Sequence, residues 1–243
     1  MMESARVVDQ LVVWLRDYVQ SANCRGVVFG LSGGIDSAVV AGLAVRAFGD
    51  NALGVIMPCY SDPEDAEHAQ LCAQALGLSV VTVDLDETFD TMCEALPVAD
   101  GAPRLAVANL KPRLRMTVLN YYAAARNALV LGGTNRSEWI IGYFTKHGDT
   151  GVDLMPIAGL VKQQVRELAL YLGVPQVIID KAPSAGLWAG QTDEQEMGIS
   201  YEQLDRYILQ GEAEPHVRQL VDRLHRQSEH KRRLPPMPPL QLE

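Results

Sequence analysis

The run Ser-Gly-Gly-Ile-Asp-Ser at residues 32–37 combines hydroxyls, glycines and one carboxylate directly after an apolar stretch. Backbone N–H groups at a turn from strand to helix bind phosphate, helped by the positive end of the helix. A Walker-type loop would place Lys-Ser or Lys-Thr after its last glycine, and no lysine follows here. Mg²⁺ favours one or two carboxylates together with phosphate oxygens, which gives Asp36 a role beside an anion that would otherwise repel it. We therefore expect this turn to hold a metal-bound pyrophosphate.

The same residues also fit a purely structural turn. Glycine-serine turns are common, and Ser32 or Asp36 could simply cap the following helix. The complete string favours the phosphate site, because Gly33 and Gly34 let the backbone approach an anion without a Cβ clash. Ser32 and Ser37 would add hydroxyl donors.

The elements that must position this turn alternate between short apolar runs and helical stretches. Continuous β-branched runs are typical of strands buried on both faces, so the sequence predicts an α/β fold with an open parallel sheet and helices on both faces. No linker or internal repeat divides the chain, and we expect a single domain over residues 1–243. The expected strands are GVVFGL (26–31), ALGVIM (52–57), LSVVTVDL (78–85) and NALVLGG (127–133).

Helical spacing of Val8, Leu11, Val12, Leu15 and Val19 predicts an amphipathic helix before the first strand. Irregular, polar and glycine-containing segments at 142–155 and 180–198 are candidate functional loops. Prolines forbid regular structure in the last residues, 228–243. Further helices are expected at 36–48, 64–76, about 105–128, from 134–138 onward, 160–172, 200–209 and 214–228.

Composition bounds the classes of function. The chain has 243 residues, 48% of them hydrophobic, and a net charge of −9, which argues against general nucleic-acid binding but leaves room for a local basic pocket. The first residues lack the order of a signal peptide, and no apolar run approaches the roughly 18 residues of a membrane span. We expect a cytoplasmic protein whose cysteines are reduced core thiols, because Cys24, Cys59, Cys72 and Cys93 form no CxxC pair.

Longer motifs narrow the class of enzyme that the sequence resembles. The glycine turn resembles the pyrophosphate loop of the ATP pyrophosphatases, which cleave ATP to AMP and pyrophosphate. Over nearly the whole chain, the order and spacing of the motifs resemble ammonia-dependent NAD synthetase. These motifs are NLKPRLRM (109–116), GGTNRSEWIIGYFTKHGDTGVDLMPIAGLVKQQVRELA (132–169), KAPSAGLW (181–188), TDEQEMGISYEQLD (192–205) and SEHKRRLP (228–235).

The resemblance implies the adenine nucleotide alpha hydrolase-like fold and a homodimeric ligase. Such an enzyme uses Mg²⁺ and ATP to adenylate the nicotinate carboxylate of deamido-NAD. Ammonia then displaces AMP, so that the products are NAD, AMP and pyrophosphate. The apolar residues of the long helix around 105–128 exceed what one sheet face needs, and a two-fold partner would cover the excess. These residues are Leu105, Val107, Ala108, Met116, Leu119, Tyr122 and Ala123.

The resemblance also implies roles for single residues. Asp36 and Glu138 would bind the metal, although an isolated Glu138 on a helix would more often be a solvated charge. Lys162 would offset charge that grows as pyrophosphate leaves, and together with Asp36 and Asp153 it forms the predicted catalytic set. The predicted ATP-binding residues are Gly30, Leu31, Ser32, Gly33, Gly34, Ile35, Asp36, Ser37, Thr134, Lys162 and Ser184.

The residues that match positions holding deamido-NAD are Arg113, Lys146, Asp153, His230 and Lys231. Lys146 can neutralise the nicotinate carboxylate or the dinucleotide phosphates. Asp153 can accept a hydrogen bond from a ribose hydroxyl or take a proton from the incoming ammonium, and both roles stay open. The HKRR run would by itself ordinarily be a solvated tail, but the resemblance implies that it closes over the active site, where its cations would meet an anionic substrate.

The chain departs from the family pattern at three positions. Pro112 replaces the usual alanine and could shift Arg113, in which case Arg115 would take its role. Thr150 replaces a glycine, and Ser184 replaces a threonine while keeping the hydroxyl.

Two rival interpretations remain. One is another ATP-pyrophosphatase-type synthetase that acts on a different carboxylate or carbonyl. The other is an ATP-binding sensor without turnover, which would not need both Asp36 and Glu138. We expect no fused glutaminase domain, because 243 residues leave no room for one, and therefore free ammonia as nitrogen donor unless a separate subunit supplies it. We expect neither nucleic acid nor membrane as a partner.

Overall fold

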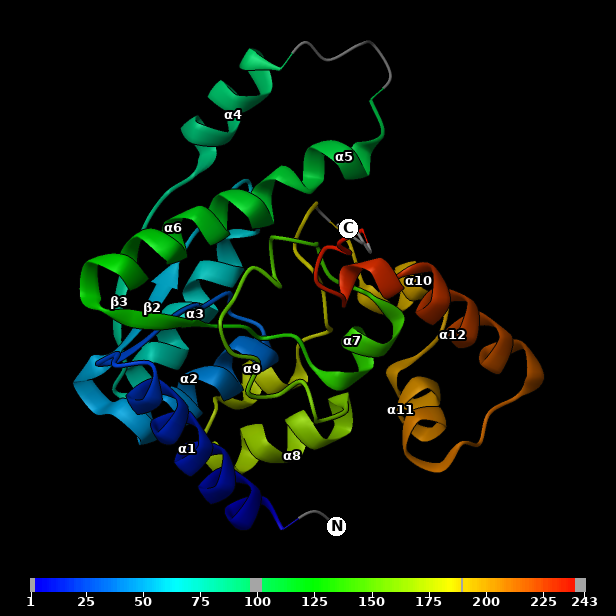
Figure 1. Ribbon diagram of the computed structural model, residues 1–243, viewed down its shortest axis with the longest axis horizontal. Coiled ribbons are helices and arrows are strands. Elements are labelled where there is room, and N and C mark those ends of the chain that lie inside the picture. Colours follow the sequence, from blue (N-terminus) through cyan, green and yellow to red (C-terminus); the bar gives the residue numbers. More distant parts are fainter. Residues whose placement is uncertain (1–2, 97–101, 189, 239–243) are drawn as a thin grey trace, which may run out of the picture.

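The computed structural model describes residues 3–96, 102–188 and 190–238. Its sheet has four parallel strands in the order β3-β2-β1-β4. Strands β2 and β3 are labelled in Figure 1. The predicted α/β fold with a parallel sheet is confirmed. The last expected strand residues after β3 leave the ladder, although the backbone N–H of Val83 still donates to Ile56 O at 2.9 Å. The strands are β1 Gly26–Gly30, β2 Ala52–Ile56, β3 Ser79–Thr82 and β4 Ala128–Leu131.

Helices cover both faces of the sheet, as predicted. Val27 and Phe29 of β1 pack on one side with α1, α2 and α8, whereas Val28 packs on the other side with Met116 and Leu119 of α6. Alternate residues of one strand therefore contribute to two separate cores. The helices within the described residues are α1 Ser4–Ser21, α2 Ile35–Phe48, α3 Pro63–Leu76, α4 Asp86–Ala95, α5 Arg104–Ala108, α6 Leu110–Arg126, α7 Arg136–Ile141, α8 Lys162–Leu172, α9 Gln176–Asp180, α10 Asp193–Met197, α11 Tyr201–Gln210 and α12 Pro215–Gln227.

The helix expected at about 105–128 is two helices. Pro112 has no N–H to donate to the carbonyl of Ala108, four residues earlier, and the helix breaks between α5 and α6 at Asn109. The predicted excess of apolar surface is also smaller than expected. Four of the seven residues are buried in the chain's own fold: Ala108, Met116, Leu119 and Ala123.

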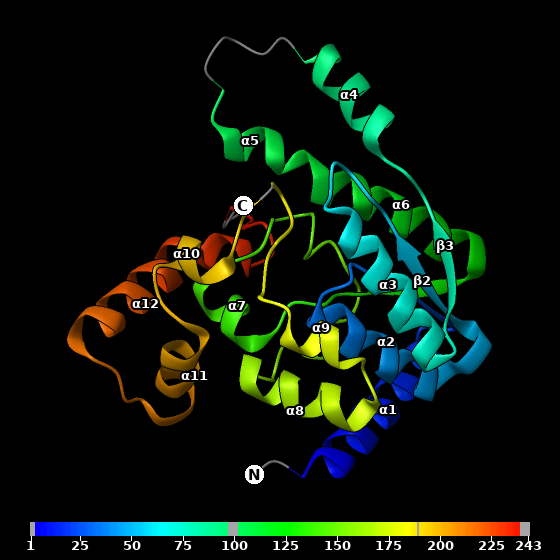
Figure 2. The same cartoon turned by 180° about the vertical axis from the view of Figure 1, so that it is seen from behind.

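The C-terminal helices form a third core beside the sheet (Figure 2). We call α7, α10, α11 and α12 the helical cluster. Its buried residues include Ile141, Met197, Leu204 and Val217. The segment 180–198, expected to be a loop, contains the short helix α10 and the end of α9. Ala189 and residues 239–243, which belong to predicted loop and tail segments, lie outside the described residues.

The burial of the cysteines and the length of the helices bear on two predictions made from the sequence. All four cysteines are free, but only Cys59 and Cys72 are buried, and Cys24 and Cys93 are half-buried. The prediction of core thiols is confirmed for Cys59 and Cys72, Cys24 is only partly buried but packs against the main core, and the prediction is wrong for Cys93. In the described part of the chain, every helix is too short or too polar to span a membrane.

Candidate active site

The turn between β1 and α2 holds the predicted phosphate-binding residues in a compact network. The hydroxyl of Ser37 donates to Gly34 O at 2.9 Å and lies 3.1 Å from that of Ser32. Gly33 has φ +80°, and a Cβ there would lie 2.2 Å from the backbone oxygen of Asp65. At Gly34 the nearest atom to an added Cβ would be the Ser32 hydroxyl at 3.4 Å. Gly33 is thus required by packing on α3 as well as by its backbone conformation.

Two carboxylates and one ammonium meet at this turn. The Nζ of Lys162 lies 2.5 Å from Asp36 Oδ2 and 3.5 Å from Glu138 Oε1. Asn135 donates from Nδ2 to the other oxygen of Asp36 at 2.9 Å. Asp36, Glu138 and Lys162 all lie in the first turns of α2, α7 and α8. The structure therefore brings the predicted metal pair and the predicted catalytic lysine together.

Burial and charge determine how these groups ionise. Burial raises the pKa of Glu138 to about 8, with a further contribution from the negative charge of Asp36, while Lys162 opposes the shift. For Lys162, burial disfavours the ammonium, but the charges of Asp36 and Glu138 outweigh it and raise its pKa. Lys162 therefore stays charged, and Glu138 is poised to gain a negative charge when a cation approaches.

Thr134 and Ser184 flank this arrangement. Thr134 is buried beside Gly133, where an added Cβ would lie 3.9 Å from the backbone nitrogen of Ser37, so the turns after β1 and β4 adjoin. Ser184 accepts a hydrogen bond from Gly186 N at 3.1 Å. Its segment is attached to α3, because Lys181 donates to Asp65 at 2.8 Å.

The same segment is attached to α6 at its other end. The Nζ of Lys111 donates to Leu187 O at 3.0 Å, and Leu187 N donates to Gln191 Oε1 at 2.7 Å. The backbone oxygen of Asp65 faces Gly33, so the segment that carries Ser184 reaches the helix end on which the glycine turn packs.

Four predicted substrate residues form a connected row. The Nε of Arg113 donates to Lys146 O at 3.3 Å, and Lys146 Nζ donates to His230 O at 2.9 Å. Lys231 Nζ donates to the carbonyls of Gly142 and Phe144 at 2.8 and 2.9 Å. The C-terminal segment thus folds back over the loop after α7 at Lys231, whereas Leu234 and Met237 farther along the chain are exposed.

The side chains of Arg115 and Asp153 form hydrogen bonds that hold neighbouring segments of the fold together. Arg115 donates to Met57 O at 3.0 Å and to the Ser61 hydroxyl at 3.1 Å, at the carboxyl end of β2. Asp153 Oδ2 accepts from Val130 N at 2.8 Å, and its own N–H donates to Val130 O at 3.0 Å, so the residue covers the open edge of β4. Arg113, which is exposed, keeps the freedom to reach a ligand.

Three residues of the site were not predicted. Asn135 binds Asp36, and Tyr201 OH lies 3.2 Å from Glu138 Oε1 and 2.9 Å from Asp193 Oδ2. Asn135 carried a local signal, since Asn-x-x-Glu is a helix-start pattern. Asp193 and Tyr201 lie in the TDEQEMGISYEQLD motif, but nothing in their spacing relates them to Glu138.

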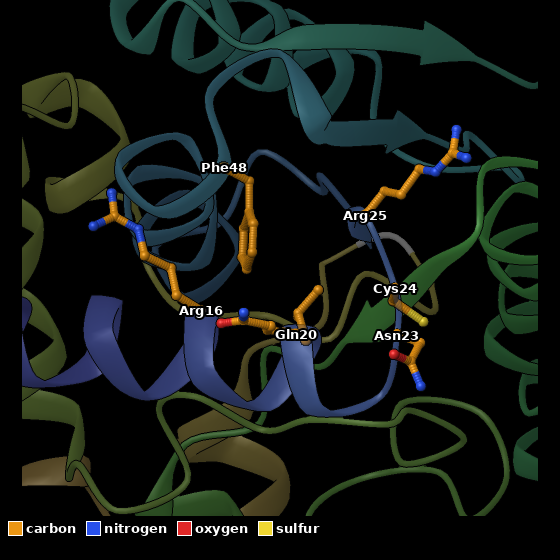
Figure 3. A pocket seen from close by; sticks show the side chains of 7 residues that line it. Arg16, Gln20, Asn23, Cys24, Arg25 and Phe48 are labelled. Carbon is orange, nitrogen blue, oxygen red and sulfur yellow. The ribbon is translucent and has the colours of Figure 1, made fainter.

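A pocket of about 400 Å³ lies at the opposite end of the sheet (Figure 3). It is lined in part by Arg16, Gln20 and Phe48, and by residues 23–25 directly before β1. The Arg16 guanidinium donates to Ala47 O and Arg46 O at the end of α2. This pocket is therefore separate from the candidate site, which lies at the carboxyl ends of β1 and β4.

Comparison with known proteins gives consistent results. The family model described as NAD synthase matches residues 7–235. A curated relative from Carboxydothermus hydrogenoformans, named NH(3)-dependent NAD(+) synthetase, is 52% identical over 234 residues, which cover 96% of each chain.

Two solved structures resemble the whole fold. The NMN synthetase from Francisella tularensis has a TM-score of 0.94 and 36% identity, and covers 99% of this chain and 100% of its own. The NH3-dependent NAD synthetase from Campylobacter jejuni has a TM-score of 0.80 and 27% identity, with 98% and 99% covered. The expected adenine nucleotide alpha hydrolase-like fold is confirmed by these neighbours. Because the family model spans most of the residues and the relative shares half of them, the chain belongs to the NAD synthase family.

Proposed function

We propose that this chain is an ammonia-dependent NAD synthetase, a ligase that forms the amide of deamido-NAD at the expense of ATP. The nicotinate carboxylate attacks the α-phosphorus of ATP, and pyrophosphate leaves. Ammonia then attacks the acyl carbon of the adenylate, AMP leaves with the C–O bond electrons, and one proton is released. The names of the 52%-identical relative and of other curated relatives support this reaction.

The observation that carries the proposal is the meeting of Asp36, Glu138 and Lys162 beside the glycine turn. An ATP-binding sensor would need the turn alone. Two carboxylates within reach of one buried ammonium suit a centre at which phosphate charge changes during a reaction. An enzyme acting on a different acid would use the same centre. The identity of the substrate is therefore inferred from membership of the family and from the row of basic residues between Arg113 and Lys231.

Mg²⁺ belongs to the proposal as the ion between carboxylates and phosphates. Asp36 and Glu138 fit it, because Mg²⁺ is bound through one or two carboxylates plus phosphate oxygens rather than by an all-protein cage. Within the described residues, no cluster of three or more His, Cys, Asp or Glu side chains could hold a metal. When bound with ATP, the ion would neutralise part of the charge on the phosphates.

The chain's own groups would bind and orient ATP. Ser32 and Ser37 would donate to phosphate oxygens from the turn, and Thr134 and Ser184 would contact the nucleotide from two sides. Lys162 would transfer its ammonium contact from Asp36 toward the leaving pyrophosphate. Before nucleotide binds, the charges of Asp36 and Glu138 raise the pKa of Lys162 and keep its ammonium charged.

The row formed by Arg113, Lys146, His230 and Lys231 would hold the anionic substrate. Lys146 and Lys231 now bind carbonyl oxygens, and a carboxylate or phosphate is a stronger partner for an ammonium than a carbonyl. Asp153 would bind a ribose hydroxyl or accept a proton from ammonium with the oxygen that does not face Val130.

A second candidate function is NMN synthesis. The NMN synthetase from Francisella tularensis matches this fold with a TM-score of 0.94, compared with 0.80 for the Campylobacter NAD synthetase. An enzyme of that kind acting by the same chemistry would amidate nicotinate mononucleotide, which lacks the adenylate half of deamido-NAD.

Pyrophosphate release tests these alternatives together. Purified protein is given ATP, Mg²⁺ and ammonium with either deamido-NAD or nicotinate mononucleotide. We expect a kcat/KM at least tenfold higher with deamido-NAD. A preference for the mononucleotide would establish the second candidate, and no release with either would refute both. Glutamine replacing ammonium at equal efficiency would contradict free ammonia as the donor.

Three further parts of the proposal concern the setting of the enzyme. We propose a homodimer formed through α4, α5 and α6, where Met92, Leu96, Leu105 and Tyr121 are exposed. A separate subunit that supplies ammonia remains compatible with the reaction. Free cysteines suit a reducing compartment, so we propose a cytoplasmic location.

A further inference from the structure

One face of α11 contacts both α7 and α8, the helices that carry Glu138 and Lys162. Tyr201 and Asp205 are four residues apart, so their side chains lie on the same face of the helix. Both are buried, with 6% and 3% of their surface exposed.

Tyr201 contacts the functional side chains directly. Its hydroxyl lies 3.2 Å from Glu138 Oε1, and the Nζ of Lys162 lies 4.8 Å from the centre of its ring. An ammonium over an aromatic face is attracted by the ring. Tyr201 therefore restrains the carboxylate with its edge and the ammonium with its face.

Asp205 contacts the same two helices, through a side-chain hydroxyl on α7 and a backbone N–H on α8. Its Oδ1 accepts from the Ser137 hydroxyl at 2.6 Å, and its Oδ2 accepts from Gln163 N at 2.8 Å. Ser137 precedes Glu138 and also accepts from Lys162 N at 3.2 Å. One buried carboxylate thus joins the first turns of α7 and α8 next to the residues that do the chemistry.

Asp193 supports Tyr201 from behind. Its Oδ2 accepts from the Tyr201 hydroxyl at 2.9 Å, while its buried Oδ1 has no hydrogen-bond partner among the described residues. The N–H of Asp193 donates to Pro183 O at 3.0 Å, next to Ser184. The Tyr201 hydroxyl has one proton, which it can donate to only one of the two facing carboxylates at a time, and turning away from both would remove that hydrogen bond from a buried acceptor.

We propose that Tyr201 and Asp205 are positioning residues, and that through them α11 sets the placement of Glu138 relative to Lys162. Since the metal pair includes Glu138, this placement determines the affinity for a divalent ion bound with ATP. The inference rests on the proposed function for the identity of the ion and nucleotide. It adds that α11, which carries none of the predicted site residues, positions the groups of the site.

The decisive variant is Tyr201→Phe, which keeps the ring and removes the hydroxyl. Its matched control is Tyr207→Phe on the same helix, where the hydroxyl donates to Asp222 at 2.8 Å, away from the site. Mn²⁺ binding is measured by electron paramagnetic resonance with α,β-methylene-ATP present. Glu138 must be charged to bind the cation, and the variant removes the hydroxyl that contacts this charged form, so we expect the Kd of Tyr201→Phe to rise about tenfold or more. The KM for Mg²⁺ rises with it, and Tyr207→Phe keeps the wild-type values.

Asp205 supplies a second pair of variants. Asp205→Ala removes both acceptors, whereas Asp205→Asn keeps one for Gln163 N, and we expect it to recover part of the Mn²⁺ affinity. A merely structural role would lower Tm in both variants and leave Mn²⁺ affinity unchanged. The inference is overturned if Tyr201→Phe binds Mn²⁺ as the wild type does. Failure of the proposed function would instead show as a wild-type protein that binds Mn²⁺ with nucleotide but releases no pyrophosphate.

Discussion

The two oxygens of the Glu138 carboxylate serve different purposes. Oε2 accepts from Asn135 N at 3.2 Å, and Asn135 Oδ1 accepts from Glu138 N at 3.0 Å, which completes a capping box at the start of α7. Oε1 faces Lys162 and Tyr201. A helix-start motif and the proposed metal-binding role are therefore compatible in one residue, because the cap holds one oxygen and directs the other toward Lys162.

Removal of either proposed metal ligand tests this centre most directly. We expect Asp36→Ala and Glu138→Ala to lower kcat at least about a hundredfold, since a metal ion supplies several kcal/mol of charge stabilisation. Pyrophosphate release is measured over a range of Mg²⁺ concentrations, with circular dichroism to verify the fold. Asp9→Ala, which removes an exposed carboxylate on α1, is the control. Near-normal activity of either variant at limiting Mg²⁺ would show that the assignment is wrong.

The raised pKa of Glu138 gives a dependence of stability on pH. Its pKa is about 8 in the folded protein and near 4.5 in an ordinary setting, so between these values the folded state holds more protons than the unfolded chain. The free energy of unfolding therefore falls as pH rises through this window. Without divalent ions, we expect the Tm of Glu138→Gln to decline less than that of the wild type between about pH 5 and about pH 8.

The comparison of wild type with Glu138→Gln must separate the titration of Glu138 from that of its neighbours. Asp36, Lys162, Asp193 and Tyr201 also face Glu138, and they remain in both proteins. Substitution of the exposed Glu87 by Gln is the control and leaves the wild-type slope. Parallel Tm curves for wild type and Glu138→Gln would mean that Glu138 titrates normally.

At the scale of elements, the β1–α2 turn depends on how closely it approaches α3. Gly33 and Gly77 both have positive φ, +80° and +65°, but only Gly33 would bring a Cβ against backbone, at 2.2 Å from Asp65 O. Gly77→Ala isolates the conformational cost, about 1–2 kcal/mol. We expect Gly33→Ala to cost a further ~1–3 kcal/mol by overpacking and to raise the KM for ATP. Urea unfolding measures the first effect; equal midpoints for the two variants would contradict it.

Elements with a strong local pattern were predictable, and contacts between distant segments were not. Val27, Val28 and Phe29 form an unbroken apolar run, and the strand they predict is present. Helix α10 has five residues inside a polar segment, too short for a periodic signal. The contact of Tyr201 with Glu138 joins residues 63 positions apart and depends on how α11 packs. The row from Arg113 to Lys231 came from family resemblance, because isolated basic residues carry no spacing signal.

For the whole molecule, strand order explains where the site lies. The chain builds β1, β2 and β3 outward in one direction and then returns to place β4 on the other side of β1. At this reversal of strand order, the loops after β1 and β4 leave in opposite directions and a crevice forms between them. In open α/β sheets, ligands bind in such a crevice at the carboxyl ends of the strands. The turns that carry Asp36 and Glu138 are the two that border it.

The proposed dimer can be tested at the same scale. Light scattering of the wild type should give twice the 26.6 kDa of one chain. Leu105 on α5 is 55% exposed, and we expect Leu105→Asp to shift the protein toward monomers. Val13 on α1 is similarly exposed, so Val13→Asp is the control and stays dimeric. A wild type that remains at 26.6 kDa at all concentrations would refute the dimer.

The separate core of the helical cluster has a consequence for the order in which the molecule opens. Its buried residues form a group distinct from the two cores that hold the sheet. Small cooperative units of this kind unfold locally at a lower free energy than the whole protein. Opening of α11 and α12 would withdraw Tyr201 and Asp205 while β1 and β4 stay paired. In dilute denaturant, hydrogen exchange in α11 would therefore accelerate and activity would vanish while the amides of the sheet remain protected.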